Sequence, residues 1–167
     1  MRFVKPAFIP ALALIATLTL SAGTSVAAGL DIKAFAGQWQ GNGISESDVS
    51  ATFRMTARDL NVAIELQDGG FAVTTTTIQR KKGDPSNPQA VRKSSRREFV
   101  PGSTAGVWVA RNYSNPASEQ AFSWARIKDQ TLTITSVEVD REGGSNMLIY
   151  DRTLSASGMK LEFRRLV

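Results

Sequence analysis

Between residue 38 and the end of the chain, apolar and polar residues alternate with a period of two in one segment after another. Such alternation is typical of β-strands that bury one face and expose the other. It predicts strands over residues 38–44, 49–56, 60–66, 71–79, 94–100, 105–112, 120–128, 131–139, 147–154 and 159–165. We expect little helix beyond a short turn formed by Leu30, Ile32 and Phe35.

The segments between these strands are short and rich in turn-forming residues. In Asp68-Gly69-Gly70, two glycines supply the positive φ values of a tight hairpin. Short strands joined by short turns predict a series of neighbouring antiparallel hairpins. We therefore expect an all-β fold, an antiparallel up-and-down barrel of about eight to ten strands, because closure removes the unpaired edges that invite aggregation. Two packed sheets are the alternative.

The first 28 residues have the layout of a cleavable secretory signal. Arg2 and Lys5 precede an apolar run from residue 7 to residue 20, and small residues follow up to Ala28. This run is shorter than the roughly 20 residues of a transmembrane helix. We therefore expect residues 1–28 to be a signal peptide, residues 29–167 to form a single barrel domain, and the protein to be secreted, into a bacterial periplasm.

The chain contains no histidine and no cysteine. Disulfides, cysteine nucleophiles, Ser-His-Asp triads and soft-ligand metal sites are therefore excluded. Glu138, Asp140 and Glu142 alternate as ligands of a hard cation would, but we interpret them as a solvated outer face. We expect no enzyme, no cofactor and no metal, although a hydrolase that uses two carboxylates stays open.

Positive charge is concentrated in one part of the chain. The formal net charge is +5, and removal of Arg2 and Lys5 with the signal leaves about +3. We interpret the basic residues of segment 80–97 as a patch for an anionic envelope surface, where each cation contributes about 1 kcal/mol; a solvated hairpin is the alternative. Nucleic acid is not expected, because aromatic residues do not interleave with the cations. The patch consists of Arg80, Lys81, Lys82, Arg92, Lys93, Arg96 and Arg97.

The start of the predicted barrel, with Phe35, Gly37 and Trp39, resembles the opening of the calycin superfamily, which includes lipocalins and fatty-acid-binding proteins. The resemblance implies that Gly37 lets the first strand bend, that Trp39 closes the barrel floor, and that an arginine of the last strand lies across its ring. Arg165 is the preferred partner of Trp39, with Arg164 second. The helical pair of fatty-acid-binding proteins has no room here, and the histidine of nitrobindin-type haem barrels is missing. In the alternative interpretation, Trp39 is an ordinary buried aromatic residue.

Four aromatic residues of the later strands are candidates for a ligand pocket, namely Trp108, Phe122, Trp124 and Tyr150. Aromatic side chains that face a cavity of about 300 to 1,000 Å³ make a site for small molecules or acyl chains. They could equally fill the barrel as solid core, as in small barrels.

We expect a monomeric binding protein for a small apolar or amphiphilic ligand, such as a lipid. The alternative is a non-catalytic interaction or inhibitor module of the bacterial envelope.

Overall fold

The computed structural model describes residues 30–46, 55–80, 90–112 and 121–167. One 3-10 helix, η1 (Ile32–Phe35), precedes the strands and matches the expected helical turn. The prediction of an all-β fold is confirmed. The nine strands of this part of the chain are β1 (Gly37–Glu46), β2 (Met55–Gln67), β3 (Gly70–Arg80), β4 (Ala90–Pro101), β5 (Val107–Ala110), β6 (Phe122–Lys128), β7 (Thr131–Val139), β8 (Ser145–Ser155) and β9 (Gly158–Leu166).

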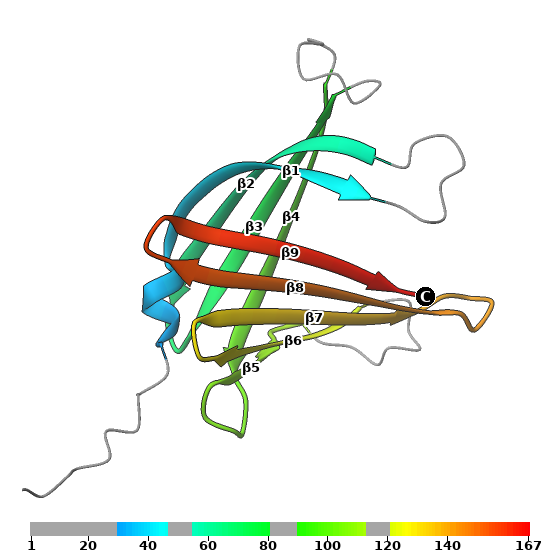
Figure 1. Ribbon diagram of the computed structural model, residues 1–167. Coiled ribbons are helices and arrows are strands. Elements are labelled where there is room, and N and C mark those ends of the chain that lie inside the picture. Colours follow the sequence, from blue (N-terminus) through cyan, green and yellow to red (C-terminus); the bar gives the residue numbers. More distant parts are fainter. Residues whose placement is uncertain (1–29, 47–54, 81–89, 113–120) are drawn as a thin grey trace, which may run out of the picture.

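These strands form one antiparallel sheet in chain order, and the sheet curls into a nearly closed barrel (Figure 1). Because the strand number is odd, β1 and β9 run in the same direction, as their arrows in Figure 1 show. The two edge strands are not hydrogen-bonded neighbours. The barrel therefore has a seam between β1 and β9, and both of these strands begin at the end where η1 lies.

The segment after β1 differs from the prediction. Two strands were expected over residues 49–56 and 60–66, whereas the chain continues through Asp59 as the single strand β2, which pairs with β1 and β3 along its length. A lone aspartate in an alternating segment therefore lies on the outer face and does not mark a turn. Residues 47–54 and the predicted signal peptide lie outside the described residues. Within the described part of the chain, no helix is long and apolar enough to cross a membrane.

The strand register determines which side chains face the interior, because residues directly opposite each other share a face of the sheet. Trp39 pairs with Val62, and Val62 pairs with Thr75. Val62 is only 3% exposed, so this set faces inward. Since neighbouring residues alternate between faces, the inward set of each strand follows from one buried member.

The η1 end of the barrel is filled with side chains. Phe35, Phe71 and Phe99 are fully buried, and Ile32 joins them from η1. The Phe71 ring stacks on Phe99 with centroids 5.0 Å apart and meets the edge of Trp108 at 5.5 Å. Such aromatic pairs add about 0.5 to 1.5 kcal/mol beyond their burial. This cluster closes one end of the barrel and leaves the other half for a cavity.

The β2–β3 hairpin turns at Asp68-Gly69, where Gly69 has a φ of +69°. A positive φ was also predicted for Gly70, but Gly70 is not among the glycines with positive φ. It is required for another reason, the space around it. A Cβ added to Gly70 would lie 2.0 Å from the carbonyl oxygen of Phe99 on β4. The missing side chain thus allows β3 and β4 to approach each other beside the aromatic cluster.

Candidate binding site

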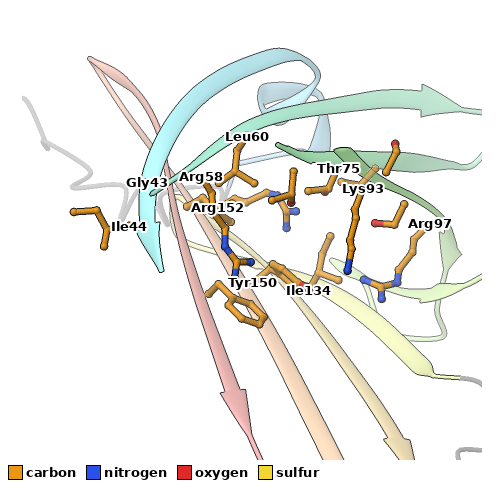
Figure 2. Close-up of a pocket in the computed structure, with 16 residues that line it drawn as sticks. Gly43, Ile44, Arg58, Leu60, Thr75, Lys93, Arg97, Ile134, Tyr150 and Arg152 are labelled. Atoms are coloured by element: carbon orange, nitrogen blue, oxygen red, sulfur yellow. The ribbon is translucent and has the colours of Figure 1, made fainter. Parts of the chain in front are cut away.

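A cavity of about 490 Å³ lies between β1–β4 and β7–β9 (Figure 2). Its apolar wall is formed by aliphatic side chains and two aromatic rings, those of Tyr150 and Phe163, whose centroids are 4.9 Å apart. Hydroxyl groups of β3 and β4 and four cationic side chains form the polar wall. The aliphatic residues include Leu60, Val73, Ile134 and Leu161, the hydroxyl residues Thr75, Thr77 and Ser95, and the cations are Arg58, Lys93, Arg97 and Arg152.

The register explains why these cations face the cavity. Lys93 pairs with Thr77 and Arg97 pairs with Val73, so both lie on the inward face of β4. Arg152 pairs with Leu132, which is fully buried, and therefore points inward from β8. Among the described residues, no aspartate or glutamate lines the cavity. The described lining therefore has a positive field without a counter-charge.

Arg152 is the most buried of these cations, with 2% of its surface exposed. Its Nε and Nη1 atoms are buried and have no hydrogen-bond partner, and neither has the buried Nε of Arg58. Burial lowers the pKa of Arg152 to about 10; Tyr150 opposes this change, and the positive charge of Arg97 adds to it. The guanidinium is therefore still charged at neutral pH, and two of its three nitrogen atoms have no hydrogen-bond partner.

Two cations on the outer face, Arg96 and Arg164, are arranged differently, because each has a carboxylate beside it. Arg96 Nη1 lies 2.7 Å from Glu65 Oε2, and Arg96 Nε lies 3.4 Å from Glu98 Oε1. Arg164 Nη2 donates to Asp151 Oδ2 at 2.6 Å. The protein thus pairs these outer cations with carboxylates and leaves the inner ones without any, an arrangement that fits an anionic ligand better than a structural role.

The prediction that the basic residues of segment 80–97 form one surface patch is wrong, because the described members lie on both faces of β4. Residues that adjoin each other in a strand point to opposite faces, so β4 sends Arg92 and Arg96 outward but Lys93 and Arg97 into the cavity. The remaining members, Lys81, Lys82 and the side chain of Arg80, lie outside the described residues. Contiguous positive charge in the sequence is therefore divided between two sides of the sheet.

The predicted contact between Trp39 and an arginine of the last strand is not formed. Arg165 donates from Nε and Nη2 to Asn146 Oδ1, at 3.0 and 2.6 Å, and Arg164 binds Asp151. With nine strands, the last strand ends away from η1, whereas Trp39 stands near the start of β1. Trp39 itself is half-buried against the core, and its Nε1 donates to the carbonyl oxygen of Phe35 at 2.9 Å.

Gly37, the other predicted barrel-end residue, begins β1 with a φ of +137°. This conformation favours glycine, and a Cβ at this position would meet no atom within 4 Å. The requirement for glycine is therefore one of backbone conformation, in agreement with a bend at the start of the strand.

The four aromatic residues predicted to line one pocket lie in three different places. Tyr150 lines the cavity and Trp108 packs in the aromatic cluster, whereas Phe122 and Trp124 face outward. On β6 the inward residues are the small ones, Ser123 and Ala125, which are buried. Phe122 and Trp124 instead contact each other, with ring centroids 5.6 Å apart. The assignment of these two rings to the pocket was wrong because residue size does not determine which face is buried.

Sequence reasoning missed Arg58 and Arg152, although the alternating pattern contained a signal for both. Arg58 shares its face with Leu60 and Val62, and Arg152 shares its face with Tyr150 and Leu154. A cation in an apolar series is the unusual observation, since buried cations are rare unless they are paired. A search for charged residues at inward positions would have found the site.

The described lining of the cavity offers groups that bind, namely hydrogen-bond donors, cations and apolar surface. The titratable side chains among the described lining residues are Tyr150 and the four cations. The described lining contains no carboxylate and no imidazole, the groups most often used in general acid–base catalysis. In the described part of the chain, no group of acidic side chains could hold a metal ion. No family model, no curated protein and no solved structure matches this chain significantly.

Proposed function

We propose that this chain is an exported, non-catalytic binding protein whose cavity holds a small amphiphile with an anionic head. The observation that carries the proposal is the buried guanidinium of Arg152, with two nitrogen atoms that have no partner. A buried charged donor without an acceptor is unfavourable. An anion in the cavity would accept these hydrogen bonds, and each such charged bond contributes about 1.5 to 3 kcal/mol.

The apolar wall supports a ligand that is more than an ion. Leu60, Val73, Ile134 and Leu161 present hydrocarbon surface beside the cations, and each buried methylene group of a ligand contributes about 0.8 kcal/mol. The volume of about 490 Å³ lies within the usual range for small-molecule sites. An anion attached to a hydrocarbon body would use both walls.

The sequence supplies the remaining parts of the proposal. Residues 1–28 support export to the periplasm, and Phe35, Gly37 and Trp39 support a relationship to calycins, many of which carry small amphiphiles. With nine strands the last strand ends away from η1, so its arginines do not reach Trp39. We therefore base the function on the cavity and keep the relationship as a secondary expectation.

A series of ligands that differ only in the head group tests this function. We expect decanoate to bind the exported protein at least 10-fold more tightly than decanol or decyltrimethylammonium in isothermal titration calorimetry. Replacement of an inward cation, Arg97→Met, should weaken decanoate binding at least 10-fold. Its outward neighbour supplies the matched control, since Arg96→Met should leave binding unchanged. Equal binding of the three ligands, or binding of none, would overturn the proposal.

A further inference from the structure

The cavity carries more positive charge than one carboxylate neutralises. Its four cations come from three strands: Arg58 from β2, Lys93 and Arg97 from β4, and Arg152 from β8. Within the described residues, none of the four has a carboxylate partner. A bound carboxylate has one negative charge and two oxygen atoms. It would leave most of this positive charge and some of the buried donors without a partner.

A phosphate monoester matches the site more closely. It has three terminal oxygen atoms, and above its second pKa of about 6 it carries close to two negative charges. We infer that the head group of the ligand is a phosphate monoester dianion; this inference rests on the function proposed above and specifies its ligand class. Guanidinium groups are well suited to such a head, because their planar set of donors binds phosphate oxygens in pairs.

The placement of the cations supports a head group that is contacted from several sides. β4 and β8 contribute cations from two different parts of the barrel wall, and Figure 2 shows Lys93 and Arg97 on one side of the cavity and Arg152 beside Tyr150 on the other. The charge of Arg97 is close enough to affect that of Arg152. A tetrahedral group with three oxygen atoms can contact both walls at once, which a planar carboxylate does less well.

Neutral donors complete the polar wall. Thr75 and Ser95 are directly opposite each other on β3 and β4, and Thr77 is opposite Lys93. All of these side chains line the cavity. Their hydroxyl groups can donate to phosphate oxygens that the cations leave unbound. The described part of the polar wall therefore offers many donors and no carboxylate that would repel the head group.

The described lining of the cavity contains no side chain of the types that ordinarily titrate between pH 5 and pH 7.5. The chain has no histidine, and the titratable or charged groups that line the cavity are Arg58 from β2, Lys93 and Arg97 from β4, and Tyr150 and Arg152 from β8. None of these groups is a carboxylate, whereas a phosphate monoester has its second pKa at about 6. A change of affinity between pH 5 and pH 7.5 therefore reports the charge of the ligand.

Decyl phosphate and decyl sulfate provide a sharp comparison, because both heads are tetrahedral but the sulfate is a monoanion at every pH used. We expect decyl phosphate to bind the exported protein at least 10-fold more tightly than decyl sulfate at pH 7.5. At pH 5, where the phosphate is a monoanion, the two affinities should agree within about 3-fold. Equal affinities at pH 7.5, or a decanoate affinity as high as that of decyl phosphate, would overturn the inference while the proposed function still holds. Binding of none of these ligands would overturn both.

Adjacent residues of β4 give a matched pair of variants. Lys93→Met removes an inward cation and should reduce the preference for decyl phosphate over decyl sulfate at least 3-fold. Arg92→Met changes the opposite face of the same strand and should leave the preference as it is. A preference that is lost equally in both variants would show that general surface charge causes it, and would overturn the inference.

Inorganic phosphate distinguishes an amphiphile from the free ion. We expect inorganic phosphate to displace decyl phosphate only at concentrations at least 100-fold higher than decyl phosphate itself requires, because the apolar wall then has no partner. Displacement at equal concentrations would support the dianionic head but overturn the amphiphile of the proposed function.

Discussion

The guanidinium carbon of Arg152 lies 5.6 Å from the centroid of the Tyr150 ring. A cation–π contact contributes about 0.5 to 2 kcal/mol. Burial of a charge without a counter-ion costs several kcal/mol, and the Nε and Nη1 atoms of Arg152 have no hydrogen-bond partner. Tyr150 therefore compensates only part of this cost, which means that Arg152 destabilises the protein without ligand.

Arg152→Met should consequently increase the free energy of unfolding, by about 1 to 4 kcal/mol, although it removes a residue of the proposed ligand site. Urea unfolding followed by circular dichroism measures this change. Arg164→Met is the control, because Arg164 is exposed and paired with Asp151 at the surface, and its loss should change stability by less than about 1 kcal/mol. A loss of more than 1 kcal/mol in Arg152→Met would show that the guanidinium has a structural role.

Anion binding should depend on pH in a direction set by Arg152. Burial lowers the pKa of this residue to about 10, and an anion binds the charged form. The affinity for decyl sulfate should therefore be constant from pH 5 to pH 9 and decrease above pH 10, where an ordinary arginine would still be charged. Calorimetry at a series of pH values measures this profile.

Other titratable groups face the same space and require their own variants. They are Tyr150 on β8 and Lys93 on β4, beside Arg58 and Arg97. Lys93→Met and Tyr150→Phe should keep the decrease above pH 10, and Arg152→Met should reduce it. A decrease of unchanged size in Arg152→Met would assign the effect to another group.

The sequence allowed the fold to be predicted because the evidence for it is local. The alternating pattern and the turn residues specify strands and hairpins one by one, and β7 extends over the predicted residues 131–139. The interior of the barrel depends on register across strands. Phe122 and Trp124 were assigned to the pocket by their size, although the buried face of β6 carries Ser123 and Ala125. Which of two alternating faces is buried becomes clear only when neighbouring strands are paired.

The contact predicted for Trp39 failed for a reason of topology. Because the expected strands 49–56 and 60–66 are replaced by the single strand β2, the sheet has nine strands and the last one ends away from η1, where Arg165 lies beside Asn146. The seven basic residues of segment 80–97 show the same limit in another form, since Lys93 and Arg97 line the cavity whereas Arg96 pairs with Glu65 outside. Composition indicated positive charge, and only the register showed which part of it is internal.

Trp39 should contribute to stability even without an arginine on its ring. Its side chain packs against the core cluster, and its Nε1 binds Phe35. Trp39→Ala should lower the free energy of unfolding by about 2 to 4 kcal/mol, somewhat less than for a fully buried tryptophan. Trp124→Ala, on the outer face, should have a clearly smaller effect. If the two variants unfold at the same urea concentration, Trp39 does not anchor the closed end.

Gly70 and Gly43 allow a comparison of two Gly→Ala substitutions. Gly43 lines the cavity and Gly70 lies beside the aromatic cluster, and the space around their Cα atoms differs. A Cβ at Gly70 would lie 2.0 Å from the carbonyl oxygen of Phe99, whereas a Cβ at Gly43 would meet nothing within 4 Å. Gly70→Ala must therefore push β3 and β4 apart beside the stacked rings of Phe71 and Phe99. We expect the free energy of unfolding to fall by about 2 to 4 kcal/mol, which is at the upper end for strain in a packed core. Gly43→Ala should be neutral or slightly stabilising, because it restricts the unfolded chain. Thermal unfolding of both variants measures the difference, and a Gly70→Ala protein as stable as the parent would show that β3 and β4 separate there without cost.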